Sequence, residues 1–344
     1  MKIIVIKVGT ASVRRDIIRS LANICKKLKE LGFGIVIVSS GAVGFGKDYI
    51  HYDHLTLARK QALASIGQPR MMKMYTDIFD ENNLIVAQLL LGRNIINDRQ
   101  QYLNAKNTMM ELLKVQVVPI VNENDAIVVQ ELKFGDNDRL SAFVAEIVDA
   151  SKLFILTDVD GLYDQHPKHP DAKIIATVNS FSTLKIEDLE STGSNSSTGG
   201  MLTKLIAAEY ATAANIDTFI INANHSERIL DIMNGNKALS THFIAQSKQS
   251  SRLWWIKNGL ISKGKLYLDD GAVNAIKSKA NLFINGIIKW DGSFNADQAV
   301  EFLDSNNLFF AKGIVNYSSK ELELLMTSKE DADIVVFREN IYIE

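Results

Sequence analysis

The sequence predicts an α/β protein with a doubly wound, mainly parallel sheet, followed by a small β-rich C-terminal domain. In the first 250 residues, apolar runs of strand length recur, and they are continuous rather than alternating, as in strands covered on both faces. Stretches of helical periodicity lie between these runs, an alternation typical of parallel sheets. Beyond residue 250 the apolar pieces become shorter and are separated by turn residues, which indicates a β-rich domain.

The expected elements follow from these patterns in chain order. The apolar runs predict strands at Ile3–Val8, Gly34–Val38, Leu84–Leu91, Val115–Val121, Leu153–Thr157 and Thr218–Ile221. The helical periodicity predicts helices at Ile17–Leu31, Leu55–Phe79, Ala105–Leu113, Leu140–Val148 and Leu205–Ala214. The short C-terminal pieces predict strands at Gly264–Leu268, Asn281–Ile284, Gly286–Ile288, Ala299–Leu303, Leu308–Ile314 and Ile334–Phe337. We therefore expect a domain at 1–250, a linker at 251–262 and a second domain at 263–344.

Composition excludes several classes of protein. The 344 residues are 47% hydrophobic and 23% charged with a net charge of −2, so nothing in the overall balance calls for nucleic acid or an acidic membrane. The one cysteine, Cys25, cannot form an internal disulfide, and its helical surroundings predict a buried thiol. No apolar run is long enough to span a bilayer, and a strand begins directly at the N-terminus, so we expect a cytoplasmic protein with no membrane partner.

Two glycine turns follow the first two predicted strands, where ligands of such sheets bind. Lys7 stands beside Gly9, so its ammonium and nearby backbone N–H groups are suited to phosphate, although an ordinary strand-end lysine gives the same pattern. The second turn spells most of a phosphate loop over Gly41–Lys47. However, Asp48 occupies the position that needs a magnesium-binding hydroxyl, which argues against a P-loop enzyme.

Acids and amides crowd two further loops, Asn122–Asp125 and Gly135–Asp138. Helix caps and Asx turns explain part of this crowding, but two clusters at one sheet edge also suit recognition of an amine or positioning of Mg²⁺ and lysines. Thr157 and Asp158 end another strand in a turn with D-x-D-G spacing. That turn lacks the downstream glutamate of a calcium loop, so we expect it to touch a ligand instead.

A serine- and glycine-rich loop, Ser196–Lys204, leads into a predicted helix. Hydroxyls, glycines and Lys204 at a helix N-terminus form an anion site, although a flexible surface loop with a capping threonine is the alternative. Lys7 and Lys204 together favour phosphoryl transfer, because that reaction needs positioned cations and little else from the protein. No Ser-His-Asp set, Cys–His pair or GxGxxG turn competes with this interpretation.

Taken together, these segments resemble the amino acid kinase family, in the branch that phosphorylates glutamate. The matching stretches are Lys7–Thr10, Ile37–Ala42, Gln61–Gln68, Tyr102–Ala105, Val118–Ala126, Gly135–Ala142, Leu156–Asp158, Gly161–Tyr163 and Thr198–Lys204. The C-terminal part is similar to a PUA domain that opens at Gly264–Ala272. Between Thr10 and the first helix the chain has only a short connection, where relatives usually carry a longer loop.

The resemblance implies ATP-dependent phosphorylation of the γ-carboxylate of L-glutamate, the first step of proline synthesis. In that reaction Lys7 and Lys204 would neutralise the transferring phosphoryl group, and Asp138 would hold both lysines in place. Ser40, Asp125 and Asn137 would bind glutamate. We expect Asp125 to meet its ammonium group, and Ser40 and Asn137 to donate hydrogen bonds to carboxylates.

The resemblance also implies the remaining partners. ATP would be bound by Lys7, Thr157, Asp158, Thr198, Gly199, Gly200, Met201, Leu202, Thr203 and Lys204. Mg²⁺ would enter with the nucleotide, held mainly by its phosphates and water, with no metal ligand from the protein. No base is required, since a carboxylate is already ionised at neutral pH. The family's dimers or tetramers and its inhibition by proline are expected here as well.

Other hypotheses about the function predict different sequence features. Acetylglutamate kinase and aspartokinase commonly show a second glycine after the first-strand lysine, where this chain has Thr10 after Gly9. Uridylate kinase would need arginines near the acceptor, whereas Asp125 and Asp136 stand there. RNA binding through the C-terminal domain would need a basic surface, but residues 261–344 hold nine basic and 13 acidic residues, a net charge of −4. A catalytically dead homologue would lack the two lysines or Asp138, which are all present.

Overall fold

The computed structural model describes residues 1–92, 95, 99–127, 137–167, 169–181, 184, 198–246, 253, 256, 260, 262–328 and 333–344. The chain separates into two compact units, Met1–Ser247 and Lys248–Glu344, and each is described by itself. Gly135, Asp136, Ser196 and Ser197 lie outside the described residues, as does most of the predicted linker at 251–262. Of the helices described, none is both long and apolar enough to cross a membrane.

Within the described part of unit 1, eight strands form one sheet in the order β3-β4-β2-β1-β5-β7-β8-β6. These strands are β1 (Ile3–Val8), β2 (Gly34–Ser39), β3 (Val86–Leu91), β4 (Val118–Glu123), β5 (Lys152–Thr157), β6 (Thr177–Val178), β7 (Asp217–Asn222) and β8 (Thr241–Phe243). Strands β1 to β5 and β7 run parallel to one another, while β8 is antiparallel to β7. The predicted doubly wound, mainly parallel sheet is therefore confirmed.

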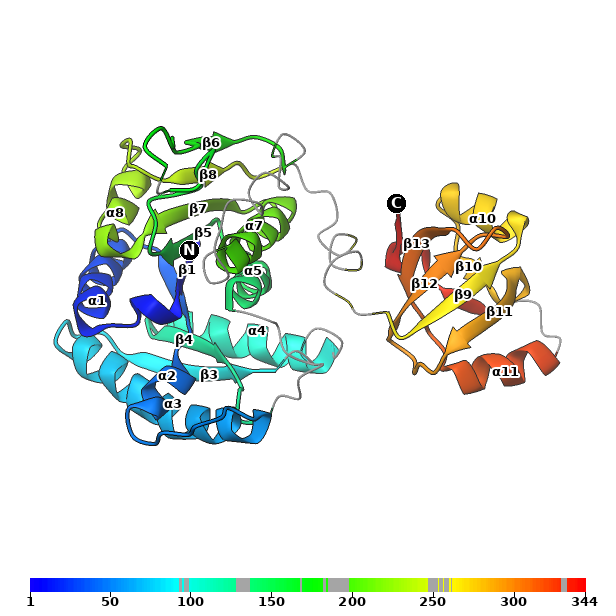
Figure 1. Cartoon of the computed structure of the whole chain (residues 1–344), viewed down its shortest axis with the longest axis horizontal. Helices are drawn as coiled ribbons and strands as arrows, with labels where there is room; N and C mark the ends of the chain where they lie inside the picture. The colour runs from blue at the N-terminus through cyan, green and yellow to red at the C-terminus, as the bar shows by residue number, and fades with distance from the viewer. Residues whose placement is uncertain are drawn as a thin grey trace. The chain divides into compact units, whose positions relative to one another are not determined.

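Helices pack on this sheet. Their apolar positions recur at helical spacing, so each helix has an apolar face that it buries against the core. They are α1 (Arg15–Glu30), α2 (Ala42–Lys47), α3 (Leu57–Asp80), α4 (Arg99–Lys114), α5 (Asn137–Ile147), α7 (Thr198–Ala213) and α8 (Arg228–Met233). Helices α1, α3 and α8 share one core cluster with the sheet, and α5 and α7 lie side by side (Figure 1). Cys25 of α1 is fully buried there, as expected, and burial raises the pKa of its thiol to about 12.

Two glycines let α2 and α3 pack backbone against backbone. A Cβ on Gly46 of α2 would overlap the carbonyl oxygen of Leu63, and a Cβ on Gly67 of α3 would overlap that of Ala42. The sequence predicts a glycine-rich turn after β2, but only Gly41 forms the turn, with a φ of 107°, and the helix begins directly after it. The second glycine of the phosphate-loop pattern, Gly46, therefore serves helix packing and does not form a phosphate loop.

Unit 2 is β-rich, as predicted. Its described residues form a five-stranded sheet in the order β11-β9-β12-β13-β15 and a two-stranded sheet of β10 and β14. The strands are β9 (Gly264–Leu268), β10 (Leu282–Phe283), β11 (Ile287–Gly292), β12 (Ala299–Leu303), β13 (Phe309–Ile314), β14 (Ile334–Val336) and β15 (Ile341–Ile343). Two helices, α10 (Asp270–Lys277) and α11 (Ser319–Ser328), were not expected from the sequence. The side chain of Asp269 caps α10 by accepting a hydrogen bond from the N–H of Ala272.

Candidate active site

The register of the central strands brings the predicted site to one edge of the sheet. Val8 of β1 pairs with Ser39 of β2 on one side and with Leu156 of β5 on the other. The residues that follow each strand are therefore neighbours in space, although they lie far apart in the chain. Because these strands end side by side, the polar segments that follow the apolar runs converge.

A cavity of about 630 Å³ lies at this edge. Of the predicted site residues it is lined by Lys7, Ser40, Asp125, Asn137, Asp138, Thr157, Asp158, Gly200, Thr203 and Lys204. Thr198 and Gly199 begin helix α7, and Met201 and Leu202 are half-buried in the same helix without lining the cavity. The lining also includes Glu123 and the segments Gly9–Ser12 and Gly41–Gly44, which contain the two glycine turns expected to lie at a ligand.

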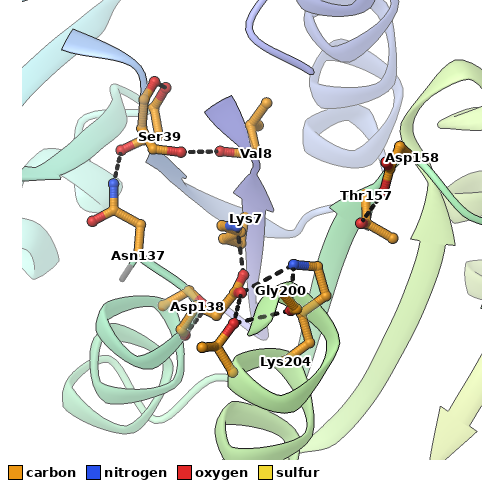
Figure 2. Close-up of polar contacts among 12 residues, drawn as sticks. Lys7, Val8, Ser39, Asn137, Asp138, Thr157, Asp158, Gly200 and Lys204 are labelled. Carbon is orange, nitrogen blue, oxygen red and sulfur yellow. Dashed lines mark hydrogen bonds and ion pairs between the residues drawn. The ribbon is translucent and has the colours of Figure 1, made fainter. Parts of the chain in front are cut away.

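One carboxylate joins the two lysines. Asp138 in the first turn of α5 is 2% exposed, and its oxygens lie 2.5 Å from Lys7 Nζ and 3.1 Å from Lys204 Nζ. The hydroxyl of Thr203 donates to the same carboxylate at 2.9 Å, and Lys204 also donates to the carbonyl of Gly200 at 3.0 Å. Figure 2 shows Lys7 and Lys204 approaching Asp138 from a strand and a helix, so both ammonium groups are fixed at the cavity wall.

The charges around Asp138 set its protonation. Burial by itself raises the pKa of this carboxyl, but the nearby charges of Lys7 and Lys204, with hydrogen bonds from Lys7 and Thr203, outweigh burial and hold the pKa below its ordinary value. Asp138 is therefore ionised at neutral pH. One negative charge between two positive charges leaves this part of the cavity cationic.

We expect acid to weaken the fold through Asp138. A depressed folded-state pKa stabilises the protein above the unfolded-state value of about 3.9, and this contribution is lost as the pH falls through the lower folded-state value. Urea unfolding of the wild type and of Asp138→Asn between pH 7 and pH 3 tests this. The variant should be less stable at pH 7 and should lose less stability on acidification. Parallel pH curves for the two proteins would contradict the assignment.

The substrate-side residues present acceptor oxygens to the cavity. Ser40 donates its hydroxyl proton to the carbonyl of Val8 at 3.0 Å. Asn137 uses both hydrogens of its amide, on the carbonyl of Ser39 at 2.7 Å and on Asn122 Oδ1 at 2.8 Å. The expectation that Ser40 and Asn137 donate to substrate carboxylates therefore does not match these hydrogen bonds, because their donors already serve the protein.

Two carboxylates extend this acceptor surface. Asp125 is half-buried in the turn after β4, and Glu123, the last residue of that strand, is 7% exposed. Both line the cavity. Glu123 is a site residue that the motif analysis missed, although it stands inside the Asn122–Asp125 cluster. The cavity therefore has a cationic side at Lys7 and Lys204 and an acceptor side at the end of β4.

An ion pair holds the turn after β5. Thr157 donates to the carboxylate of Asp158 at 3.0 Å, and both residues line the cavity. Asp160, two residues further, pairs with Arg228 of α8 at 2.6 Å. This pair accounts for the second acid of the D-x-D-G pattern. Among the residues that the structure describes, no group of three or more His, Cys, Asp or Glu side chains is arranged to hold a metal ion.

Comparison with known proteins gives the class. A family model described as the amino acid kinase family matches residues 2–222, and one described as the PUA domain matches residues 264–334. The carbamate kinase of Giardia lamblia, solved with AMP-PNP, aligns with a TM-score of 0.52 and 18% identity over 71% of this chain and 99% of its own. That likeness concerns the fold. Fold, family model and paired lysines together define a kinase.

Curated relatives extend the match to the whole chain. Glutamate 5-kinase of Rippkaea orientalis is 41% identical over 99% of this chain and 98% of its own length. Glutamate 5-kinase of Nostoc punctiforme is 40% identical over 99% of both. The chain belongs to the amino acid kinase family, and the resemblance drawn from the motifs is confirmed.

Proposed function

We propose that this protein transfers the γ-phosphoryl group of ATP to the γ-carboxylate of L-glutamate, the reaction that opens proline synthesis. One observation carries the proposal: the cavity has a cationic side at Lys7 and Lys204 and an acceptor side at Asp125, Glu123, Ser40 and Asn137. Glutamate matches these two sides, with a carboxylate to receive the phosphoryl group and an ammonium group to donate hydrogen bonds to the acceptor oxygens. The whole-length relatives named glutamate 5-kinase support the same acceptor.

The chemistry asks little of the protein beyond position and charge. An oxygen of the γ-carboxylate attacks the γ-phosphorus, the bond from that phosphorus to its bridging oxygen breaks, and ADP leaves as an acyl phosphate forms. Because the nucleophile is already ionised, no proton has to be removed. Lys7 and Lys204 stabilise the charge on the transferring group, and Asp138 keeps them aligned.

ATP would occupy the part of the cavity between α7 and the end of β5. The N-terminus of α7 with Gly200, Thr203 and Lys204 fits a polyphosphate, since backbone N–H groups and a cation converge there. Thr157 and Asp158 would contact the nucleotide from the opposite wall. Mg²⁺ would arrive with ATP and supply further charge neutralisation, bound by phosphate oxygens and water.

The deciding experiment measures ADP release from Mg·ATP by the purified protein. L-Glutamate is compared with N-acetylglutamate, L-aspartate and UMP, each at equal concentration. Turnover with L-glutamate alone is expected, because only an acceptor with a free ammonium group and a carboxylate at the right distance satisfies both sides of the cavity. Turnover with another of these acceptors, or with none, would contradict the proposal.

Several finer features are part of the same proposal. L-Proline would inhibit the enzyme, the protein would form dimers or tetramers in the cytoplasm, and the domains would divide at 1–250, 251–262 and 263–344. Adding millimolar proline to the ADP assay tests inhibition, and unchanged turnover would rule it out. Light scattering of the purified protein gives the oligomeric state, which a monomer would contradict.

A further inference from the structure

Behind the cavity wall, four side-chain amides form a hydrogen-bonded row. Asn137 Nδ2 donates to Asn122 Oδ1 at 2.8 Å, Asn122 Nδ2 donates to Gln68 Oε1 at 2.8 Å, and Gln68 Nε2 donates to Gln88 Oε1 at 3.0 Å. Asn122 is 1% exposed and Gln68 8% exposed, so the middle of the row is buried. Gln68 ends the Gln61–Gln68 motif, for which the reaction itself gives no role.

Backbone groups fix the direction of this row. Asn137 Nδ2 also faces the carbonyl oxygen of Ser39 at 2.7 Å, and a carbonyl only accepts. Asn122 Oδ1 faces the N–H of Glu123 at 2.8 Å, and an N–H only donates. Turning either amide over would set donor against donor or acceptor against acceptor inside the protein, at the cost of an unsatisfied buried group. The row therefore has one polarity.

We propose that Gln68 is a positioning residue that selects substrates with a free ammonium group. Through Asn122 it holds the Asn137 amide so that both hydrogens point into the protein and the oxygen is the atom left for the substrate. Ser40 is arranged the same way, because its proton goes to Val8. An ammonium group donates to such oxygens, whereas a hydroxyl donates only once and a methylene not at all.

A second cavity lies beside this row. A space of about 310 Å³ is lined by Gln68, Gln88, Glu123 and Asp125 among others. Glu123, Asp125 and Ala42 line both this space and the main cavity, so the two spaces are neighbours. Gln68 thus offers Asn122 an acceptor at a point where a second space adjoins the main cavity.

The test compares two substitutions of Gln68. Gln68→Met keeps the length of the side chain but removes the acceptor for Asn122. Gln68→Glu, ionised or protonated, keeps an acceptor oxygen there. For Gln68→Met we expect KM for L-glutamate to rise about tenfold or more, while kcat and KM for ATP change by less than about threefold. Gln68→Glu should keep KM for L-glutamate near the wild-type value.

Substrate discrimination separates this role from a structural one. The ratio of kcat/KM for L-glutamate to that for 2-hydroxyglutarate, and to that for glutarate, should fall in Gln68→Met and be retained in Gln68→Glu. Gln88→Leu, at the exposed end of the row, offers a variant that does not disturb the core, and a smaller rise in KM for L-glutamate is expected. The inference would be overturned if Gln68→Met left both KM for L-glutamate and the discrimination ratio unchanged. If Gln68→Met does not fold, an unchanged KM for L-glutamate in Gln88→Leu would overturn it.

The inference rests on the proposed function, and the same assays separate their failures. If the wild type does not phosphorylate L-glutamate, the proposed function is wrong and the inference falls with it. If the wild type is active on L-glutamate and the discrimination ratio does not respond to Gln68, the inference alone is overturned. A rise in KM for ATP equal to that for L-glutamate would also overturn it, because a general loosening of the fold would affect both substrates.

Discussion

Lys7→Ala should lower kcat for glutamate phosphorylation by about 10²- to 10³-fold, the range seen when one preorganised electrostatic group is removed from a reacting centre. Lys7 is 5% exposed, and in the proposed reaction its ammonium is one of the two that would face the transferring phosphoryl group. Its loss also leaves the buried carboxylate of Asp138 with Lys204 as its one remaining lysine partner among the described residues. The measurement is ADP release at saturating ATP and L-glutamate.

Lys152→Ala is the matched control. This lysine begins β5, at the opposite edge of the sheet from the cavity, and it pairs with Asp217 at 3.1 Å. Both side chains are partly exposed, so the pair contributes about 0–1 kcal/mol to stability and nothing to the reaction. The control should keep wild-type kcat. A folded Lys7→Ala protein with kcat within about threefold of the wild type would show that Lys7 does not act on the transferring group.

Gly67→Ala should lower the free energy of unfolding by about 1–3 kcal/mol, as overpacking does in a well-packed interior. The added Cβ would overlap the carbonyl oxygen of Ala42, so α2 and α3 would have to separate. Because Ala42, Val43 and Gly44 of α2 line the cavity, KM for glutamate should rise as well. Urea unfolding and steady-state kinetics measure the two effects.

Gly44→Ala in α2, the helix that packs against Gly67, is the stability control. A Cβ at this position meets no atom within 4 Å, and alanine is a better helix former than glycine by about 0.8–1 kcal/mol. Its free energy of unfolding should equal or exceed that of the wild type. If Gly67→Ala were as stable as Gly44→Ala, the backbone contact between the two helices would not be needed for the fold.

The sequence was sufficient for the elements whose apolar pattern is strong. Strands β1, β2, β5 and β7 were predicted to within a residue, since they are buried on both faces and read as continuous apolar runs. Helix α2 was missed because Gly44 and Gly46 argue for a turn, and its packing against α3 overrides that local preference. Strands β6 and β8 have only two and three residues, too few to show a period.

The site was predictable as a set of residues and less so as a set of hydrogen bonds. Lys7, Asp138 and Lys204 stand in motifs next to strand and helix ends, so their meeting follows from the topology of a parallel sheet. The direction in which Asn137 and Ser40 point their donors depends on carbonyl groups of β1 and β2, which no local motif encodes. The fold therefore had to be known before the acceptor character of the substrate side could be seen.

The bridge at Asp138 also bears on when the enzyme becomes active during synthesis. Its partners come from positions 7 and 204, so the reacting centre spans nearly the whole of unit 1. Loop closure over such separations is slow, and a chain still on the ribosome cannot complete it until α7 has emerged. Nascent chains that end before α7 thus carry Lys7 and Asp138 without Lys204, and we expect no phosphoryl transfer from them.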